Sequence, residues 1–150
     1  MTVWHGNTTG CLWFYFNGEL TKADWQAYMD QMALHTRPEG ALTETAMIIS
    51  HRSGSPTPTM RREVAEFMRD KKELLAHLKG HAMVTESALT RGSLIALNWI
   101  FKKPFPERVF SEPTSALRWL SEISVMAKGD EIWAEIKRVV APEAMWSVSR

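Results

Sequence analysis

Hydrophobic and polar positions alternate along this chain in blocks that predict strands followed by helices. Apolar runs at residues 46–49, 82–84 and 109–110 are each followed by a stretch whose apolar positions recur at helical spacing. Such repetition predicts a mostly parallel sheet covered by helices. Residues 11–16 are apolar without alternation, which is typical of a strand buried on both faces. With a short strand at residues 3–5, this run predicts an N-terminal β-hairpin.

Capping signals place the first two helices. Thr21 followed by Asp24 has the spacing of a capping box and predicts a helix over residues 22–35. Thr57 followed by Pro58 predicts an N-cap and a first helical position, and the apolar stripe of this helix continues to Leu78. Further strands are expected at residues 45–50, 81–85 and 108–111.

Two further helices are predicted after residue 85, and the first of them is expected to lie inside the fold. Ser87 is the expected cap of a helix over residues 88–101, which is apolar nearly all round, so we expect it to be well buried. Gly92 and Ala96 form a small-residue face on it that would let a neighbouring element approach closely. Pro113 opens the helix that follows the strand at 108–111.

The alternation of strands and helices stops near residue 127. Asp130 is expected to cap one further helix, whose apolar face includes Trp133 and Ile136. We therefore predict a domain over residues 1–126 and a C-terminal helical extension over residues 127–150. The extension is expected to pack on the same domain or on a second subunit.

Length and charge narrow the class of protein. A chain of 150 residues is about one domain long, and a net charge of +1 gives no reason to expect nucleic-acid binding. The N-terminus lacks the features of a signal peptide, and no apolar run approaches the ~20 residues of a membrane helix. We therefore expect a cytoplasmic protein without a membrane span. Seven tryptophans and nine methionines fit either a bulky core or a partner surface.

The sequence offers little for metal or catalytic chemistry. Of the five histidines only His77 and His81 are four residues apart, whereas a zinc site needs three or four ligands; the single Cys11 has no disulfide partner and is expected in a buried strand. His51 and Ser53 follow a central strand, at the edge where ligands bind to open α/β sheets. However, Ser53 lacks the G-x-S-x-G turn, and no acid stands out to orient His51. We expect a protein that is not an enzyme and that uses no metal and no cofactor.

Four short motifs carry a resemblance to a known protein family. Gly18, Leu20 and Thr21 form a strand-end G-x-L-T just before the first helix. The others are residues 46–50 with a Ser-Gly turn at 53–54, residues 82–87 with Arg-Gly at 91–92, and residues 109–120. Together they resemble STAS-like domains of the SpoIIAA-like, anti-sigma-factor-antagonist type, over roughly residues 10–124. The resemblance implies an α/β, STAS-like fold: an N-terminal hairpin, then a mostly parallel small sheet with about four covering helices plus one extra C-terminal helix.

The Ser-Gly turn carries the regulatory part of this resemblance. In regulatory members of the family, a kinase phosphorylates the serine before the glycine, and the added charge switches binding partners. Ser53 is the matching position, with Ser55, Thr57 and Thr59 as rival acceptors, and His51 stands where the family usually has an acid. The loop also fits an ordinary strand-to-helix turn, or an anion or ligand site at a helix N-terminus.

The resemblance thus implies a non-catalytic protein-interaction domain with a regulatory or partner-switching role. Its partner would be another protein, such as a kinase or an anti-sigma factor, and a homodimer is a further arrangement. An alternative function is to bind a small apolar or lipid ligand between sheet and helices. The residues expected to bind the partner are His51, Arg52, Ser53, Arg61, Glu86 and Arg91.

Overall fold

The computed structural model describes residues 3–36, 43–54, 56–100 and 102–147. The order of its elements confirms the predicted hairpin and the three strand–helix units that follow it. The strands are β1 (Val3–Thr8), β2 (Cys11–Asn17), β3 (Thr45–His51), β4 (Gly80–Thr85) and β5 (Glu107–Phe110). The helices are α1 (Lys22–His35), α2 (Pro58–Asp70), α3 (Lys72–Leu75), α4 (Ala88–Ile100), α5 (Pro113–Ile123), α6 (Gly129–Val139) and the 3₁₀ helix η1 (Pro142–Ala144).

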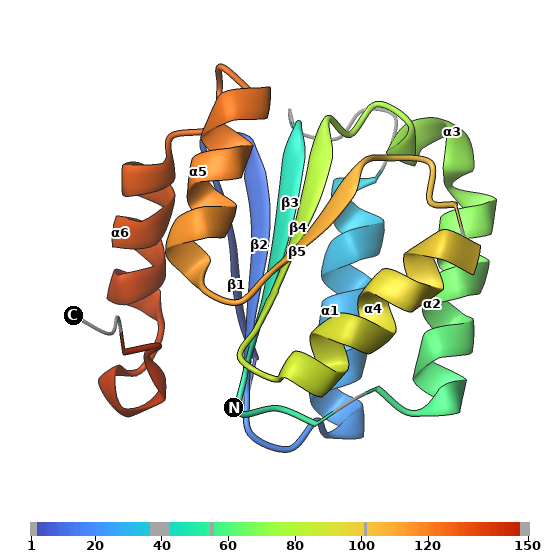
Figure 1. Cartoon of the computed structure of the whole chain (residues 1–150), viewed down its shortest axis with the longest axis horizontal. Coiled ribbons are helices and arrows are strands. Elements are labelled where there is room, and N and C mark those ends of the chain that lie inside the picture. Colours follow the sequence, from blue (N-terminus) through green and yellow to red (C-terminus); the bar gives the residue numbers. More distant parts are fainter. Residues whose placement is uncertain (1–2, 37–42, 55, 101, 148–150) are drawn as a thin grey trace.

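The strands form one five-stranded sheet in the order β1-β2-β3-β4-β5. β1 and β2 pair antiparallel, and β2 to β5 pair parallel. Successive crossovers that step in one direction along a sheet share one handedness, so their helices fall on the same face. Figure 1 shows this arrangement: α1 to α4 cover one face, and α5 and α6 cover the other. The predicted α/β fold with a mostly parallel sheet is therefore confirmed.

Helices α5 and α6 bury their face of the sheet. The strand residues beneath them, among them Trp13, Met47 and Ile49, are fully buried. α5 contacts β3, β4 and β5, and α6 contacts α5 and β1. The approach of α5 is so close that a β-carbon on Gly80 would collide with Cδ1 of Ile123. The C-terminal residues in the same core are Ala127, Ile132, Ile136, Val140 and Ala144.

The single cysteine lies in this core. Cys11 is fully buried at the start of β2 and has a free thiol, as expected. Burial raises the pKa of the thiol to about 12, so it stays protonated at neutral pH. This cysteine therefore acts as a small apolar core residue.

The capping predictions hold for α1 and α2. Thr21 Oγ1 accepts a hydrogen bond from the Asp24 N–H at 3.1 Å, and Thr57 caps α2 with Pro58 as its first residue. However, α2 ends at Asp70 rather than continuing to Leu78, and α3 follows it. A straight helix to Leu78 would be about 31 Å long. It would overshoot the neighbouring strands, which at six or seven residues are about 20–23 Å long.

The prediction that the helix at 88–101 is well buried is wrong for residues 88–96, the part whose side chains the structure describes. In α4, the side chains of Leu89 and Ile95 are 83% and 48% exposed. The space beside Gly92 is open, since a β-carbon at this residue would meet nothing within 4 Å in the described part of the chain. No described element therefore uses the small-residue face. The reason is position: α4 covers the β4–β5 end of the sheet, and the described chain adds no strand beyond β5, so no further crossover helix flanks it.

A buried charge cluster joins β4 and β5 at their amino-terminal ends. Glu107 Oε2 lies 3.0 Å from His81 Nδ1, and Glu107 Oε1 lies 2.5 Å from Lys103 Nζ. The glutamate side chain is only 3% exposed. Burial by itself raises the pKa of this carboxyl, but the pairs with His81 and Lys103 outweigh burial and lower the pKa to about 2.

Acid is expected to weaken the fold through Glu107. Because the folded-state pKa is about 2 and an unfolded glutamate titrates near about 4.3, the ionised carboxylate stabilises the fold fully above about pH 5. This contribution, on the order of 3 kcal/mol, is lost as the pH falls from about 4.3 towards 2. Urea unfolding between pH 5 and 2.5 should show a smaller loss of unfolding free energy for Glu107→Gln than for wild type. The exposed Glu131→Gln is the control, and equal losses in all three chains would contradict this.

Candidate functional site

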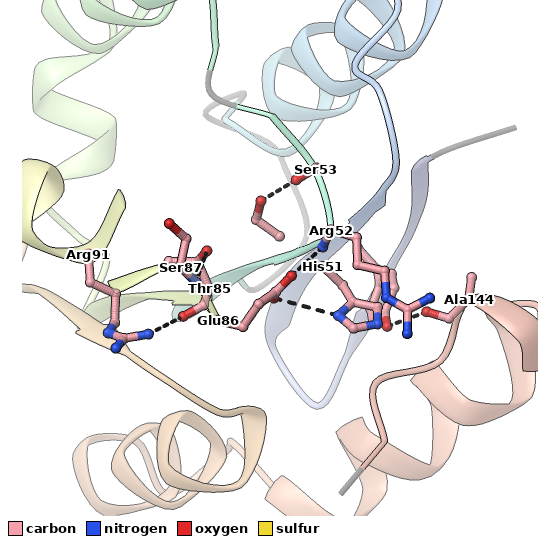
Figure 2. A network of polar contacts seen from close by, with 10 residues as sticks. His51, Arg52, Ser53, Thr85, Glu86, Ser87, Arg91 and Ala144 are labelled. Carbon is pink, nitrogen blue, oxygen red and sulfur yellow. Dashed lines mark hydrogen bonds and ion pairs between the residues drawn. The ribbon is translucent and has the colours of Figure 1, made fainter. Parts of the chain in front are cut away.

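Polar residues gather where β3 and β4 end, at the carboxyl edge of the sheet (Figure 2). β3 ends at His51, and the loop after it leads to α2. β4 ends at Thr85, and Ser87 Oγ accepts a hydrogen bond from the Thr90 N–H at 3.2 Å, which caps α4 as expected. The carboxyl edge of parallel strands is where open α/β sheets bind their ligands. The sheet therefore presents both loops on the edge that most often carries function.

Glu86 holds the two loops together. Its Oε1 accepts a hydrogen bond from the backbone N–H of Arg52 at 2.5 Å, and its Oε2 lies 3.5 Å from His51 Nδ1. Arg52 has a φ of 55°, in the left-handed region that a residue with a side chain disfavours. The hydrogen bond from the Arg52 N–H to Glu86 therefore stabilises a loop conformation that Arg52 by itself would disfavour. Figure 2 shows Glu86 reaching from the end of β4 to both residues.

His51 connects this edge to the C-terminal end of the chain. The residue is 7% exposed, and its ring centroid lies 4.9 Å from that of Trp146 and 6.3 Å from that of Tyr15. The Tyr15 hydroxyl donates to the Ala144 carbonyl oxygen at 2.6 Å. Burial raises the pKa of Tyr15 to about 12, so its hydroxyl remains a donor at neutral pH.

Tyr15 and Trp146 are residues of this site that the sequence did not predict. Both are distant from His51 in the sequence, and Tyr15 belongs to the apolar run 11–16, which predicts only a buried strand. The one available signal was the apolar pair Met145 and Trp146 after the helix-ending Pro142, because such residues in a tail need something to pack against.

Ser53 lies on the other side of the strand end from His51. Its hydroxyl contacts the hydroxyl of Ser50, one residue before His51. Because neighbouring residues of a strand point to opposite faces, Ser50 and His51 diverge, and Ser53 follows Ser50. The Ser53 hydroxyl therefore pairs with Ser50, and not with the imidazole that a serine nucleophile would use.

The structure brings three of the predicted partner-binding residues, His51, Arg52 and Glu86, into contact. Arg91 lies nearby, where its Nη1 donates to the Thr85 carbonyl oxygen at 2.9 Å. Three of the remaining predicted residues are exposed: Arg61 in the first turn of α2, Thr57 and Thr59. Ser53 is half-buried, and Ser55 lies outside the described residues.

Within the described ranges, no group of His, Cys, Asp and Glu side chains is arranged to hold a metal ion. In the same part of the chain, no helix is long and apolar enough to cross a membrane. The expectation that the protein is not an enzyme stays a prediction.

Comparison with known proteins identifies the fold. No protein-family model and no curated protein matches the chain. A solved structure does match: an uncharacterized protein from the DUF3478 family with a SpoIIAA-like fold, from Shewanella loihica PV-4. The TM-score is 0.56 at 18% identity, over 79% of this chain and 91% of the other. This chain has a SpoIIAA-like fold. The predicted STAS-like, SpoIIAA-like resemblance is thus confirmed as a statement about the fold.

Removing the Glu86 carboxylate is expected to loosen the first loop of this SpoIIAA-like domain. In Glu86→Ala, the Arg52 N–H loses its acceptor, and hydrogen exchange at this amide should become roughly ten-fold faster. The global unfolding free energy should change by less than about 1 kcal/mol, because the Glu86 side chain is 41% exposed.

The matched control is Glu122→Ala, which removes an exposed glutamate from α5. Exchange at Arg52 measured by NMR should be unchanged in this control. An Arg52 amide that is equally protected in wild type and Glu86→Ala would show that Glu86 does not hold the loop.

Proposed function

We propose that this SpoIIAA-like domain is a non-catalytic protein-interaction module that binds another protein in the cytoplasm and has a regulatory role. The surface that binds the partner, here called the docking rim, comprises described residues 52–54 and 56–61 together with residues 86–91. A second copy of this chain is one such partner protein, and a kinase or an anti-sigma factor is another.

An exposed apolar residue among charges carries this proposal. Leu89 is 83% exposed in the first turn of α4. Arg91 is the one charged residue in the α4 sequence, and its guanidinium bonds to the Thr85 carbonyl instead of standing free on the surface. Arg52 and Glu86 supply exposed charged groups at the same edge. An apolar centre with a polar surround is the usual anatomy of a protein interface.

The position of Ser53 supports a switch at this rim. A phosphate adds about −1.5 to −2 charges at neutral pH. On Ser53 it would break the contact with Ser50 and lie close to the amino-terminal end of α2, where the helix dipole favours negative charge. The loop and the first turn of α2 would then rearrange, and the docking rim would present a different surface. We propose Ser53 as the phosphorylated residue, ahead of Thr57 and Thr59.

The docking rim is tested with two charge substitutions at similarly exposed leucine and valine positions. Leu89→Lys should weaken binding to the partner captured by the wild-type chain at least ten-fold, because it places a charge at the apolar centre. Val125→Lys is the control, since Val125 is 88% exposed but lies between α5 and α6. Affinities can be measured by calorimetry. Equal loss in both variants, or in neither, would rule out the docking rim.

The switch has its own readout in the same assay. Ser53→Asp should change the partner's affinity several-fold, and protein from its native cells should carry a phosphate on Ser53. An unmodified Ser53 together with unchanged affinity in Ser53→Asp would remove the switch and leave the docking rim untouched.

A second candidate function is binding a small apolar or lipid ligand, and the unequal cover of the two sheet faces favours it. Beneath α5 and α6, Met47 and Ile49 are fully buried. On the opposite face, Ile48 and Met83 are only half-buried, and α2 has no fully buried residue. Protein interiors are close-packed, so half-buried apolar side chains beneath helices have surface left for further contacts. An apolar molecule between the sheet and helices α2 and α4 would complete their burial.

Ligand binding is expected to show in two measurements. Denaturing mass spectrometry of the purified chain should release an apolar molecule. The dye 8-anilinonaphthalene-1-sulfonate should bind the folded chain, and Met83→Lys should abolish this binding, whereas Leu89→Lys on the outer surface should not. A chain that releases nothing and leaves the dye non-fluorescent would exclude this function.

A further inference from the structure

Three polar residues lie side by side at the carboxyl edge, on the face covered by α5 and α6. Asn17 at the end of β2 is the register partner of His51 at the end of β3. Ser50 pairs with Thr85, so Glu86 comes next to His51 on the other side. Residues in register on neighbouring parallel strands point to the same face. Asn17, His51 and Glu86 therefore form a row, here called the polar ledge.

The polar ledge contains buried atoms with unused hydrogen-bonding capacity. Asn17 Oδ1 and His51 Nδ1 are both buried and have no hydrogen-bond partner in the described part of the chain. The nearest acidic oxygen to His51 Nδ1, on Glu86, is 3.5 Å away. Buried polar atoms in folded proteins nearly always have partners, and leaving them unpaired costs stability. The ledge therefore has more capacity for hydrogen bonds than the domain itself uses.

The end of the chain lies over this ledge. Residues 142–147, here called the strap, run past the edge of the sheet with Ala144 buried and Met145 and Trp146 half-buried. The Trp146 ring lies against His51, and the Tyr15 hydroxyl bonds to the Ala144 carbonyl oxygen. The backbone of Met145 is extended, with φ −67° and ψ 139°.

We propose that the strap occupies a peptide-binding site and that a partner's segment takes its place on the polar ledge. The segment would copy the strap: a short helical turn like η1 whose last carbonyl accepts from Tyr15, then an extended residue and an aromatic side chain in the position of Trp146. A side chain with N–H donors next to the aromatic residue would pair with Asn17 Oδ1, which the strap leaves unpaired. Such a segment has a hydrogen bond that the strap lacks, and so it competes with the strap.

Two opposing terms set the balance between a closed and a lifted strap. Lifting exposes Trp146 and Met145 to water, which favours the closed state. Lifting also lets water reach the His51 ring that Trp146 lies against, which removes the cost of burying its unpaired Nδ1. The balance of these two terms therefore sets how often the strap, including its core residue Ala144, is lifted. The proposal rests on the proposed function, because the partner meets the same edge as the docking rim.

The test uses the strap itself as the probe. A synthetic peptide of residues 141–147 is titrated against full-length chains, and binding is measured by calorimetry. In wild type, the peptide must compete with a tethered copy at an effective concentration in the millimolar range. Trp146→Ala weakens the tethered copy, so this variant should bind the peptide at least ten-fold more tightly than wild type does. A peptide with alanine in place of its tryptophan should not bind.

Matched variants separate the strap from general loss of packing. Trp133→Ala removes another half-buried tryptophan from the same core, on α6, and should bind the peptide no better than wild type. Tyr15→Phe removes the hydroxyl that donates to the Ala144 carbonyl, so adding it to Trp146→Ala should weaken binding of the peptide, which carries the same carbonyl. Adding His51→Ala to Trp146→Ala should abolish the binding.

Equal peptide binding by wild type and Trp146→Ala, or no binding by either of them, would overturn the strap proposal. This result would leave the docking rim standing if Leu89→Lys still weakens the partner. Conversely, peptide binding to Trp146→Ala supports the strap even if Leu89→Lys has no effect, because the peptide assay needs no outside partner.

Discussion

The packing of α5 and α6 against the sheet is the interaction on which the rest of the structure depends. Strands β2 to β4 are apolar on both faces, so each face needs a cover. The crossover helices α1 to α4 fall on one face because their connections step in one direction with one handedness. The chain after β5 must therefore cover the other face. Ile132 and Ile136 of α6 are 0% exposed, so the C-terminal segment is a structural part of the core and not an appendage to it.

This division leaves the two faces unequal. The face under α5 and α6 is sealed by side chains such as Trp13 and Leu120. The face under α2 and α4 keeps half-buried apolar side chains, and α4 exposes Leu89 and Ile95 to the outside. Core packing thus accounts for the face under α5 and α6 and for the part of the other face under α1, where Phe14 and Tyr28 are buried, whereas apolar side chains under α2 and α4 are half-buried. Both candidate functions use apolar surface in this part of the fold, one on the outside of α4 and one beneath it.

The carboxyl edge of the sheet connects the two faces. Glu86 binds the Arg52 backbone and lies near His51, and His51 lies against Trp146. His51 thus lies between the residue that holds the loop after β3 and Trp146, one of the last residues that the structure describes. In contrast, the buried Glu107 cluster at the opposite edge pairs its charges internally with His81 and Lys103, and it serves stability rather than recognition.

The sequence by itself determined the elements that depend on local chemistry. The caps at Thr21 and Thr57, the buried run of β2 and the alternation that predicts a parallel sheet are all local patterns, and the structure contains them. The tertiary structure decided whatever depends on distant partners. The exposure of α4, the break after Asp70 and the contact of His51 with Trp146 follow from where the sheet ends and which helices flank it. Periodicity shows which side of an element is apolar, but only the packed fold shows what lies against that side.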